Sequence, residues 1–143
     1  MAELCALISA LAEVPINQNI AITGSVDQFG RAQPVGGLNE KIEGFFSICQ
    51  QRGLNGKQGV IIPAPNARHL SLSQDILDAV EQEQFAIWAI EGIEDALPLL
   101  TNLVWDGEGA NYPDADYPGA HSSGDTAGCS PSLSMAVTLA GLV

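Results

Sequence analysis

Lys41 stands in the segment PVGGLNEKIEG (34–44), in the first turn of an expected helix. Leu38, Ile42 and Phe45 form the apolar stripe of that helix, and a helical wheel puts Lys41 at its flank. The partial positive charge of a helix N-terminus disfavours an ammonium group, and partial burial disfavours it further. Both effects favour the neutral amine, which can act as a general base.

The same residues also have a simpler interpretation. A lysine at a helix start is commonly a solvated side chain whose aliphatic stem covers apolar surface. Gly36 and Gly37 let the backbone pass close to a substrate or another strand, but a Gly-Gly pair before a helix is also an ordinary turn. Spacing alone leaves both interpretations open.

Apolar periodicity predicts the elements that must position this segment. Helices are expected at 2–13, 38–53, 71–84 and 92–105, strands at 20–23, 59–63 and 85–90, and a hairpin at 26–35 that turns near Gly30. This order predicts an α/β domain with at least one βαβ crossover. The first helix is apolar nearly all round, so we expect it to be buried.

The character of the chain changes after Trp105. The stretch DGEGANYPDADYPGAHSSGDTAGCS has five acidic residues and no basic one, and it is rich in Gly, Pro, Ser and Ala. That composition is typical of a flexible tail. We therefore expect one domain over residues 1–105 and an acidic, flexible tail of unknown role over residues 106–143.

Charge and hydropathy exclude two classes of partner. The net charge is -12, and the five basic residues all lie in the first half of the chain. Such a chain cannot assemble the basic surface that phosphate binding needs, so we expect no nucleic-acid partner. No uninterrupted apolar run approaches the roughly 20 residues that span a bilayer, so we expect no membrane insertion.

Neither the cysteines nor the histidines are grouped as metal ligands usually are. Cys5, Cys49 and Cys129 are widely spaced and odd in number, which indicates neither a zinc cluster nor a disulfide framework. His69 and His121 have no carboxylate or cysteine neighbours at metal-ligand spacing. We expect no bound metal and a reducing, cytoplasmic setting.

A longer stretch around Lys41 carries a family pattern. IAITGSVDQFGRAQPVGGLNEKIEGFFSICQQRGLNGKQGVIIPAPN (20–66) contains T-G, G, P-[IV]-G-G-[LV]-x-x-K, G and [IV]-[IV]-P-x-x-N in order. It resembles the proteolytic domain of the Lon proteases, a serine-lysine peptidase family, and the resemblance covers about 2–104. The details are closer to the archaeal-like Lon branch and its bacterial homologues than to the main bacterial enzyme.

The resemblance implies a fold, an assembly and a set of residue roles. The fold is the family's α/β (α+β) peptidase domain, related to the ribosomal protein S5 domain 2-like fold, in a hexameric ring that acts on proteins or peptides. Lys41 aligns with the catalytic lysine, which deprotonates a serine nucleophile. Thr23 aligns with the threonine that holds this lysine in place. Family glycines that shape the active-site wall match Gly24, Gly36 and Gly37, and Asn66 matches a loop-ordering landmark.

The serine itself is not found at the corresponding place. In the family it sits in a G-x-S-A-x loop immediately before the helix that begins here at Ala2, so the resemblance implies an N-terminally truncated domain. Ser9 and Ser25 are expected to be ordinary polar residues. No P-loop occurs, so we expect no cofactor in this chain; ATP is implied only for an ATPase module located elsewhere.

Three functional hypotheses follow from the resemblance. The first is the proteolytic domain of a Lon-like ATP-dependent serine endopeptidase that carries only the lysine of its dyad and is inactive alone. The second is a non-catalytic scaffold, assembly module or inactive fragment. The third uses the tail: GDTAGCSPSLSMAVTLAGLV (124–143) echoes the nucleophile loop, with Thr126 in the serine position and Pro131 interrupting the helix that should follow. Whether the chain is itself an enzyme stays open at this point.

Overall fold

The computed structural model describes residues 1–102 of the chain. In chain order its elements are α1 (Ala2–Ala12), β1 (Ile20–Ile22), β2 (Ser25–Val26), β3 (Ala32–Gln33), α2 (Leu38–Arg52), β4 (Gln58–Pro63), α3 (Ala64–Ala67), α4 (Gln74–Glu81), β5 (Phe85–Ile90) and α5 (Ile93–Thr101). The predicted α/β class is confirmed. The expected tail over 106–143 and the hypotheses on Thr126 and His121 lie outside the described residues.

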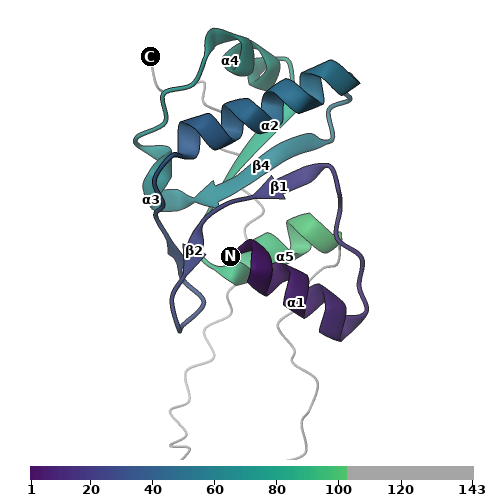
Figure 1. The fold of residues 1–143 in the computed structure, drawn as a ribbon, viewed down its shortest axis with the longest axis vertical. Coiled ribbons are helices and arrows are strands. Elements are labelled where there is room, and N and C mark those ends of the chain that lie inside the picture. The colour runs from purple at the N-terminus through teal and green to yellow at the C-terminus, as the bar shows by residue number, and fades with distance from the viewer. Residues whose placement is uncertain (103–143) are drawn as a thin grey trace, which may run out of the picture.

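Three parallel strands form the central sheet, in the order β1-β4-β5. Helix α2 connects β1 to β4, and α4 connects β4 to β5, so the expected βαβ crossovers are confirmed. Because both crossovers step along the sheet in the same direction with the usual right hand, their helices share one face. Figure 1 shows α2 and α4 on that face, with α1 and α5 on the other.

The central strand β4 is buried along its whole length and divides the core in two. Side chains of a strand alternate between the faces of the sheet. Val60 and Ile62 accordingly join the cluster under α2 and α4, while Ile61 joins the cluster under α1 and α5. A strand that is covered on both faces needs apolar side chains at successive positions, and the sequence VIIP has them here.

Helix α2 has a buried stripe with the predicted 3.6-residue period, although Phe45, which the prediction placed in it, is only half-buried. Its buried side chains are Leu38, Ile42, Phe46 and Cys49. The ring of Phe46 meets Phe85 of β5 edge-on, with 5.2 Å between the ring centroids. The helix ends at Arg52 and is capped by Gly53, the residue at which the sequence predicts its end. This packing fixes α2, and with it the first turn that carries Lys41, against the sheet.

The expected hairpin is present and is held to the end of β5. Strands β2 and β3 pair antiparallel around a turn in which Gly30 has a φ of 81°. The turn docks on the following segment, because the N–H of Ile93 donates to the carbonyl of Gly30 (2.9 Å) and that of Ala32 to Glu91 (2.7 Å). Strand β3 ends before Pro34, which cannot donate to a ladder.

The prediction that the first helix is buried is wrong. Cys5 is the one buried residue within α1, whereas Leu7 is 56% and Leu11 77% exposed. One side of α1 packs beside α5 and the sheet, but no other segment of residues 1–102 covers its remaining sides (Figure 1). The apolar composition of this helix allows it to be buried, but composition does not reveal which segment would cover it. None of the described helices combines the length and apolarity needed to cross a membrane.

Candidate functional site

Thr23 lies at the carboxyl end of β1, directly after the last paired residue. Its N–H donates to the carbonyl oxygen of Ile61 in β4, at 3.0 Å, so the backbone at Thr23 is tied to the central strand. Its side chain is half-buried. The carboxyl ends of parallel strands form the edge of an open sheet at which sites commonly lie, and Thr23 is therefore placed at such an edge.

Gly24 follows Thr23 at a point where three segments meet. Its φ is 142°, and a Cβ atom there would lie 2.7 Å from Met1 Cε and 2.8 Å from Pro63 Cγ. The amino group of Met1 also donates to the carbonyl of Gly24, at 3.2 Å. The start of α1 is therefore packed on the residue after Thr23. Sequence reasoning missed Met1, since the contact spans 23 positions and no local periodicity reveals it.

Asn66 holds the segment that leads into α2. Its Oδ1 accepts from the N–H of Val35 and its Nδ2 donates to the carbonyl of Val35, both at 3.0 Å. Because Asn66 follows β4 within α3, this pair of bonds ties the approach to α2 to the carboxyl end of the sheet. The side chain of Asn66 thus orders a loop, which is the role that the resemblance implies for it.

The two glycines before α2 differ in what they require. Gly37 is the residue that caps the helix, with a left-handed φ of 64° that favours glycine. At Gly36, by contrast, a Cβ atom would meet nothing within 4 Å. The backbone conformation therefore favours glycine at 37, whereas the described residues leave open space for a Cβ atom at 36.

Lys41 lies in the first turn of α2, and its N–H donates to the carbonyl of Gly37 at 3.3 Å. The expected partial burial is wrong for the described residues, because the Lys41 side chain is exposed although the adjacent Ile42 is fully buried. The flank of the apolar stripe faces outward at this turn. No hydrogen bond joins Lys41 to Thr23 within residues 1–102. The structure thus places the two residues on segments that are tied together without pairing their side chains.

Ser9 and Ser25 form no dyad with Lys41 among the described residues. The hydroxyl of Ser9 donates to the carbonyl of Val14 at 2.5 Å, near the end of α1 remote from Met1. Ser25 lies in β2, on an exposed position paired with Gln33. Neither hydroxyl is hydrogen-bonded to Lys41 within residues 1–102.

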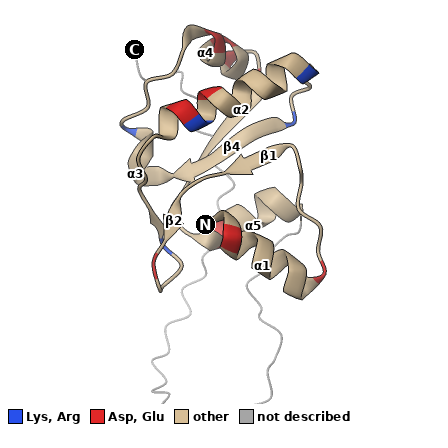
Figure 2. Ribbon diagram, in the orientation of Figure 1, with Lys and Arg blue, Asp and Glu red and all other residues tan. Residues whose placement is uncertain are grey.

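The other titratable groups include two cysteines that are buried in the core. Burial raises the pKa of the thiols of Cys5 and Cys49, which keeps them protonated at neutral pH. His69 is exposed, and residues 1–102 contain no group of three His, Cys, Asp or Glu side chains that could hold a metal ion. Basic residues are spread singly over several elements rather than gathered in a patch (Figure 2).

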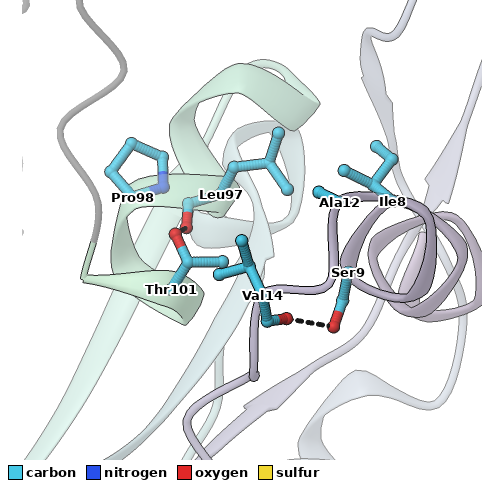
Figure 3. Close-up of a pocket in the computed structure, with 7 residues that line it drawn as sticks. All are labelled: Ile8, Ser9, Ala12, Val14, Leu97, Pro98 and Thr101. Atoms are coloured by element: carbon cyan, nitrogen blue, oxygen red, sulfur yellow. Dashed lines mark hydrogen bonds between the residues drawn. The ribbon is translucent and has the colours of Figure 1, made fainter.

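A small hollow lies between α1 and α5 (Figure 3). Its volume is about 70 Å³, and it is lined by Ile8, Ser9, Ala12, Val14, Leu97, Pro98 and Thr101. The hydroxyl of Ser9 points to the Val14 carbonyl, and that of Thr101 donates to the Leu97 carbonyl at 2.7 Å. The lining that remains is apolar, and none of Thr23, Lys41 and Asn66 contributes to it.

Comparison with known proteins gives a consistent result. The family model of the Lon protease (S16) C-terminal proteolytic domain matches residues 1–102. A Lon protease homolog of Escherichia coli (strain K12) is 77% identical over 109 residues, which are 76% of this chain and 19% of the relative. A homolog of Haemophilus influenzae is 57% identical over 100 residues (70% and 17%). The archaeal Lon protease of Methanocaldococcus jannaschii is 35% identical over 98 residues (68% and 13%). The chain spans less than a fifth of the length of these relatives.

Proposed function

Because the chain belongs to the family of Lon protease C-terminal proteolytic domains, we propose that it supplies the catalytic lysine, Lys41, of a serine-lysine endopeptidase. One observation carries this proposal: Lys41 lies in the first turn of a helix whose approach is clamped by Asn66 to the sheet end that carries Thr23. The clamp supports the proposal because it ties the approach to the lysine's helix to the same end of the sheet as the threonine that the family pairs with this lysine. Fixed positioning of this kind is what proton transfer in a site requires.

In the proposed reaction, the neutral Nζ of Lys41 takes the proton of a serine hydroxyl as its oxygen attacks the carbonyl carbon of a peptide bond. The tetrahedral intermediate then collapses, the C–N bond breaks, and the protonated lysine returns the proton to the leaving amine. Water, deprotonated by the same lysine, hydrolyses the resulting acyl-enzyme. The hydroxyl of Thr23 would orient Nζ during both proton transfers.

The exposure of Lys41 sets a requirement on this mechanism. A solvated ammonium is a poor base, and the amine becomes effective once water is displaced from around it. We expect that surface to carry the serine, since neither Ser9 nor Ser25 is hydrogen-bonded to Lys41 within residues 1–102. We therefore propose that the serine-bearing segment and the substrate together cover Lys41, and that the chain by itself does not hydrolyse peptides.

We infer the substrates, the assembly, the location and the ATP dependence from the family. We propose protein or peptide substrates, a homo-oligomeric ring of six subunits, a cytoplasmic location, and dependence on ATP through an ATPase module distinct from residues 1–102. The buried, unpaired thiols of Cys5 and Cys49 support a reducing compartment.

A non-catalytic assembly module is the second candidate, and the exposed, unpaired Lys41 favours it. The two candidates differ in what happens when a serine is supplied. Residues 1–102 would be joined to the upstream part of the E. coli relative, and casein hydrolysis would be measured. The peptidase proposal predicts hydrolysis that Lys41→Ala removes. The assembly module predicts a folded protein whose hydrolysis, if any, is indifferent to Lys41.

A further inference from the structure

Met1 is the N-cap residue of α1, and the fold buries its side chain. The residue is 9% exposed and belongs to the core cluster under α1 and α5, together with Cys5 and Ile61. Its carbonyl accepts from the N–H of Cys5 at 3.1 Å, so its backbone is part of the first turn of the helix. Methionine side chains are flexible enough to fill irregular gaps between other elements. The gap that Met1 fills lies at Gly24.

Gly24 is held by Met1 and Pro63 together. The space that a Cβ atom would need at 24 is taken by Met1 Cε, at 2.7 Å, and by Pro63 Cγ, at 2.8 Å. Pro63 is the last residue of β4 and is fully buried, so it forms a fixed wall beside Gly24. The main-chain nitrogen of Met1 also donates to the Gly24 carbonyl, at 3.2 Å. This nitrogen keeps a hydrogen to donate when another residue is joined to it.

Thr23 directly precedes Gly24, at the end of a strand that is short. Strand β1 has three residues and lies at the edge of the central sheet. The N–H of Thr23 donates to the carbonyl of Ile61 at 3.0 Å, which fixes this residue from the side of β4. The ends of elements that make few buried contacts open locally. The contacts of Met1 with Gly24 supply a further restraint directly after Thr23.

We propose that Met1 is a positioning residue for Thr23. By holding Gly24, its side chain and its main-chain nitrogen keep the end of β1 in place, so that the Thr23 hydroxyl keeps one position relative to the sheet. This role rests on the proposed function, in which the Thr23 hydroxyl orients Lys41. It extends the site from the sheet to α1, because the start of this helix and the end of β1 then move together.

Cys5 provides a matched comparison within the same helix. It is 1% exposed, lies one turn further along α1 and belongs to the same core cluster as Met1. The atoms nearest to a Cβ at 24, however, come from Met1 and Pro63 rather than from Cys5. Truncation of Cys5 therefore loosens the packing of α1 on the core without removing the contacts at Gly24.

Hydrogen exchange of single backbone amides, followed by NMR on the complete chain, tests this role without any hydrolysis. Two amides of the β1–β4 pair are compared. That of Thr23 is bonded to Ile61 at the end near Gly24, and that of Gly59 is bonded to Asn19, at 3.2 Å, at the opposite end. The variants are released from a cleavable fusion, so that residue 1 can be changed.

Met1→Ala should accelerate exchange at Thr23 about tenfold and at Gly59 about twofold or less, because it frees one end of the strand. Met1→Leu keeps an apolar side chain of similar size and should restore slow exchange at Thr23. Cys5→Ala should change both amides by the same factor. Equal acceleration of the two amides in Met1→Ala, or a selective effect of Cys5→Ala on Thr23, would overturn the proposal.

The second test measures casein hydrolysis by the chimera of residues 1–102 with the upstream part of the E. coli relative. Met1→Ala should lower kcat about tenfold and leave KM unchanged, whereas Met1→Leu and Cys5→Ala should keep kcat. In a chimera that already carries Thr23→Val, Met1→Ala should cause no further loss, since it acts through the Thr23 hydroxyl. Additive losses would refute the role. A chimera without any hydrolysis contradicts the proposed function alone, because the exchange rates still decide the role of Met1.

Discussion

Asn66 shows how one side chain can set the geometry of a site from a distance. It contacts no residue proposed to react, yet its two bonds to Val35 join the approach to α2 to the end of β4. Leaving both backbone groups of Val35 without partners costs more than losing an ordinary surface hydrogen bond. Asn66 is therefore a positioning residue, and its effect on stability can be separated from any effect on hydrolysis.

We predict that Asn66→Ala lowers the free energy of unfolding by about 1–3 kcal/mol. Asn39→Ala is the matched control, because the Asn39 amide accepts a single exposed bond, from the N–H of Ser71 at 3.2 Å. Its loss should be about 0.5 kcal/mol or less. Urea unfolding followed by circular dichroism measures both values. Equal losses for the two asparagines would contradict the role assigned to Asn66.

The glycines of the site allow a second comparison at this scale. Gly24→Ala forces a side chain into a φ of 142° and against Met1 and Pro63, so we expect a loss of about 1–3 kcal/mol. Gly36→Ala should change the unfolding free energy little, since its Cβ meets nothing within 4 Å. Thermal melts of the two variants test this, and a tolerated alanine at 24 would show that Met1 does not pack there.

Residue identities in the site were accessible from the sequence, but their environments were not. The family spacing pointed to Lys41, Thr23 and Asn66, because a motif records residue type and separation. The exposure of Lys41 and the contact of Met1 with Gly24 depend on segments distant along the chain, and no local pattern encodes them.

At the scale of elements, periodicity predicted the parallel sheet and α2 closely. Strand β5 begins and ends where the apolar run FAIWAI predicts, and α2 is capped by Gly53, the residue at which its end is predicted. The failure was α1, whose apolar residues lie on all sides while a single side is covered. The period of apolar residues identifies the apolar face of a helix. Whether that face is buried depends on which other element packs against it, and the sequence pattern does not show this.

The two buried cysteines report on whether these elements stay packed. Burial raises the pKa of Cys5 on α1 and of Cys49 on α2, so at pH 8 each holds its proton in the native state and little reactive thiolate forms. We predict slow alkylation by iodoacetamide at both positions, a rate that increases with pH, and rapid alkylation in urea. Peptide mass mapping distinguishes the sites. Fast native labelling of Cys5 alone would mean that α1 detaches readily from the sheet.

At the scale of the whole molecule, residues 1–102 leave Lys41, Leu7 and Leu11 of α1, and Phe29 exposed. The chain spans less than a fifth of the length of its relatives, and it matches their proteolytic domain from residue 1 to 102. We propose that the segment with the serine covers Lys41.

The catalytic role of Lys41 is tested most directly in a chimera in which residues 1–102 replace the matching segment of the 77% identical E. coli relative. Casein hydrolysis is measured for the chimera, for Lys41→Ala and for Lys57→Ala, an exposed lysine outside the site. The account predicts that Lys41→Ala lowers kcat by about 10³-fold or more while Lys57→Ala leaves it unchanged. An active chimera that retains its kcat without Lys41 would contradict it.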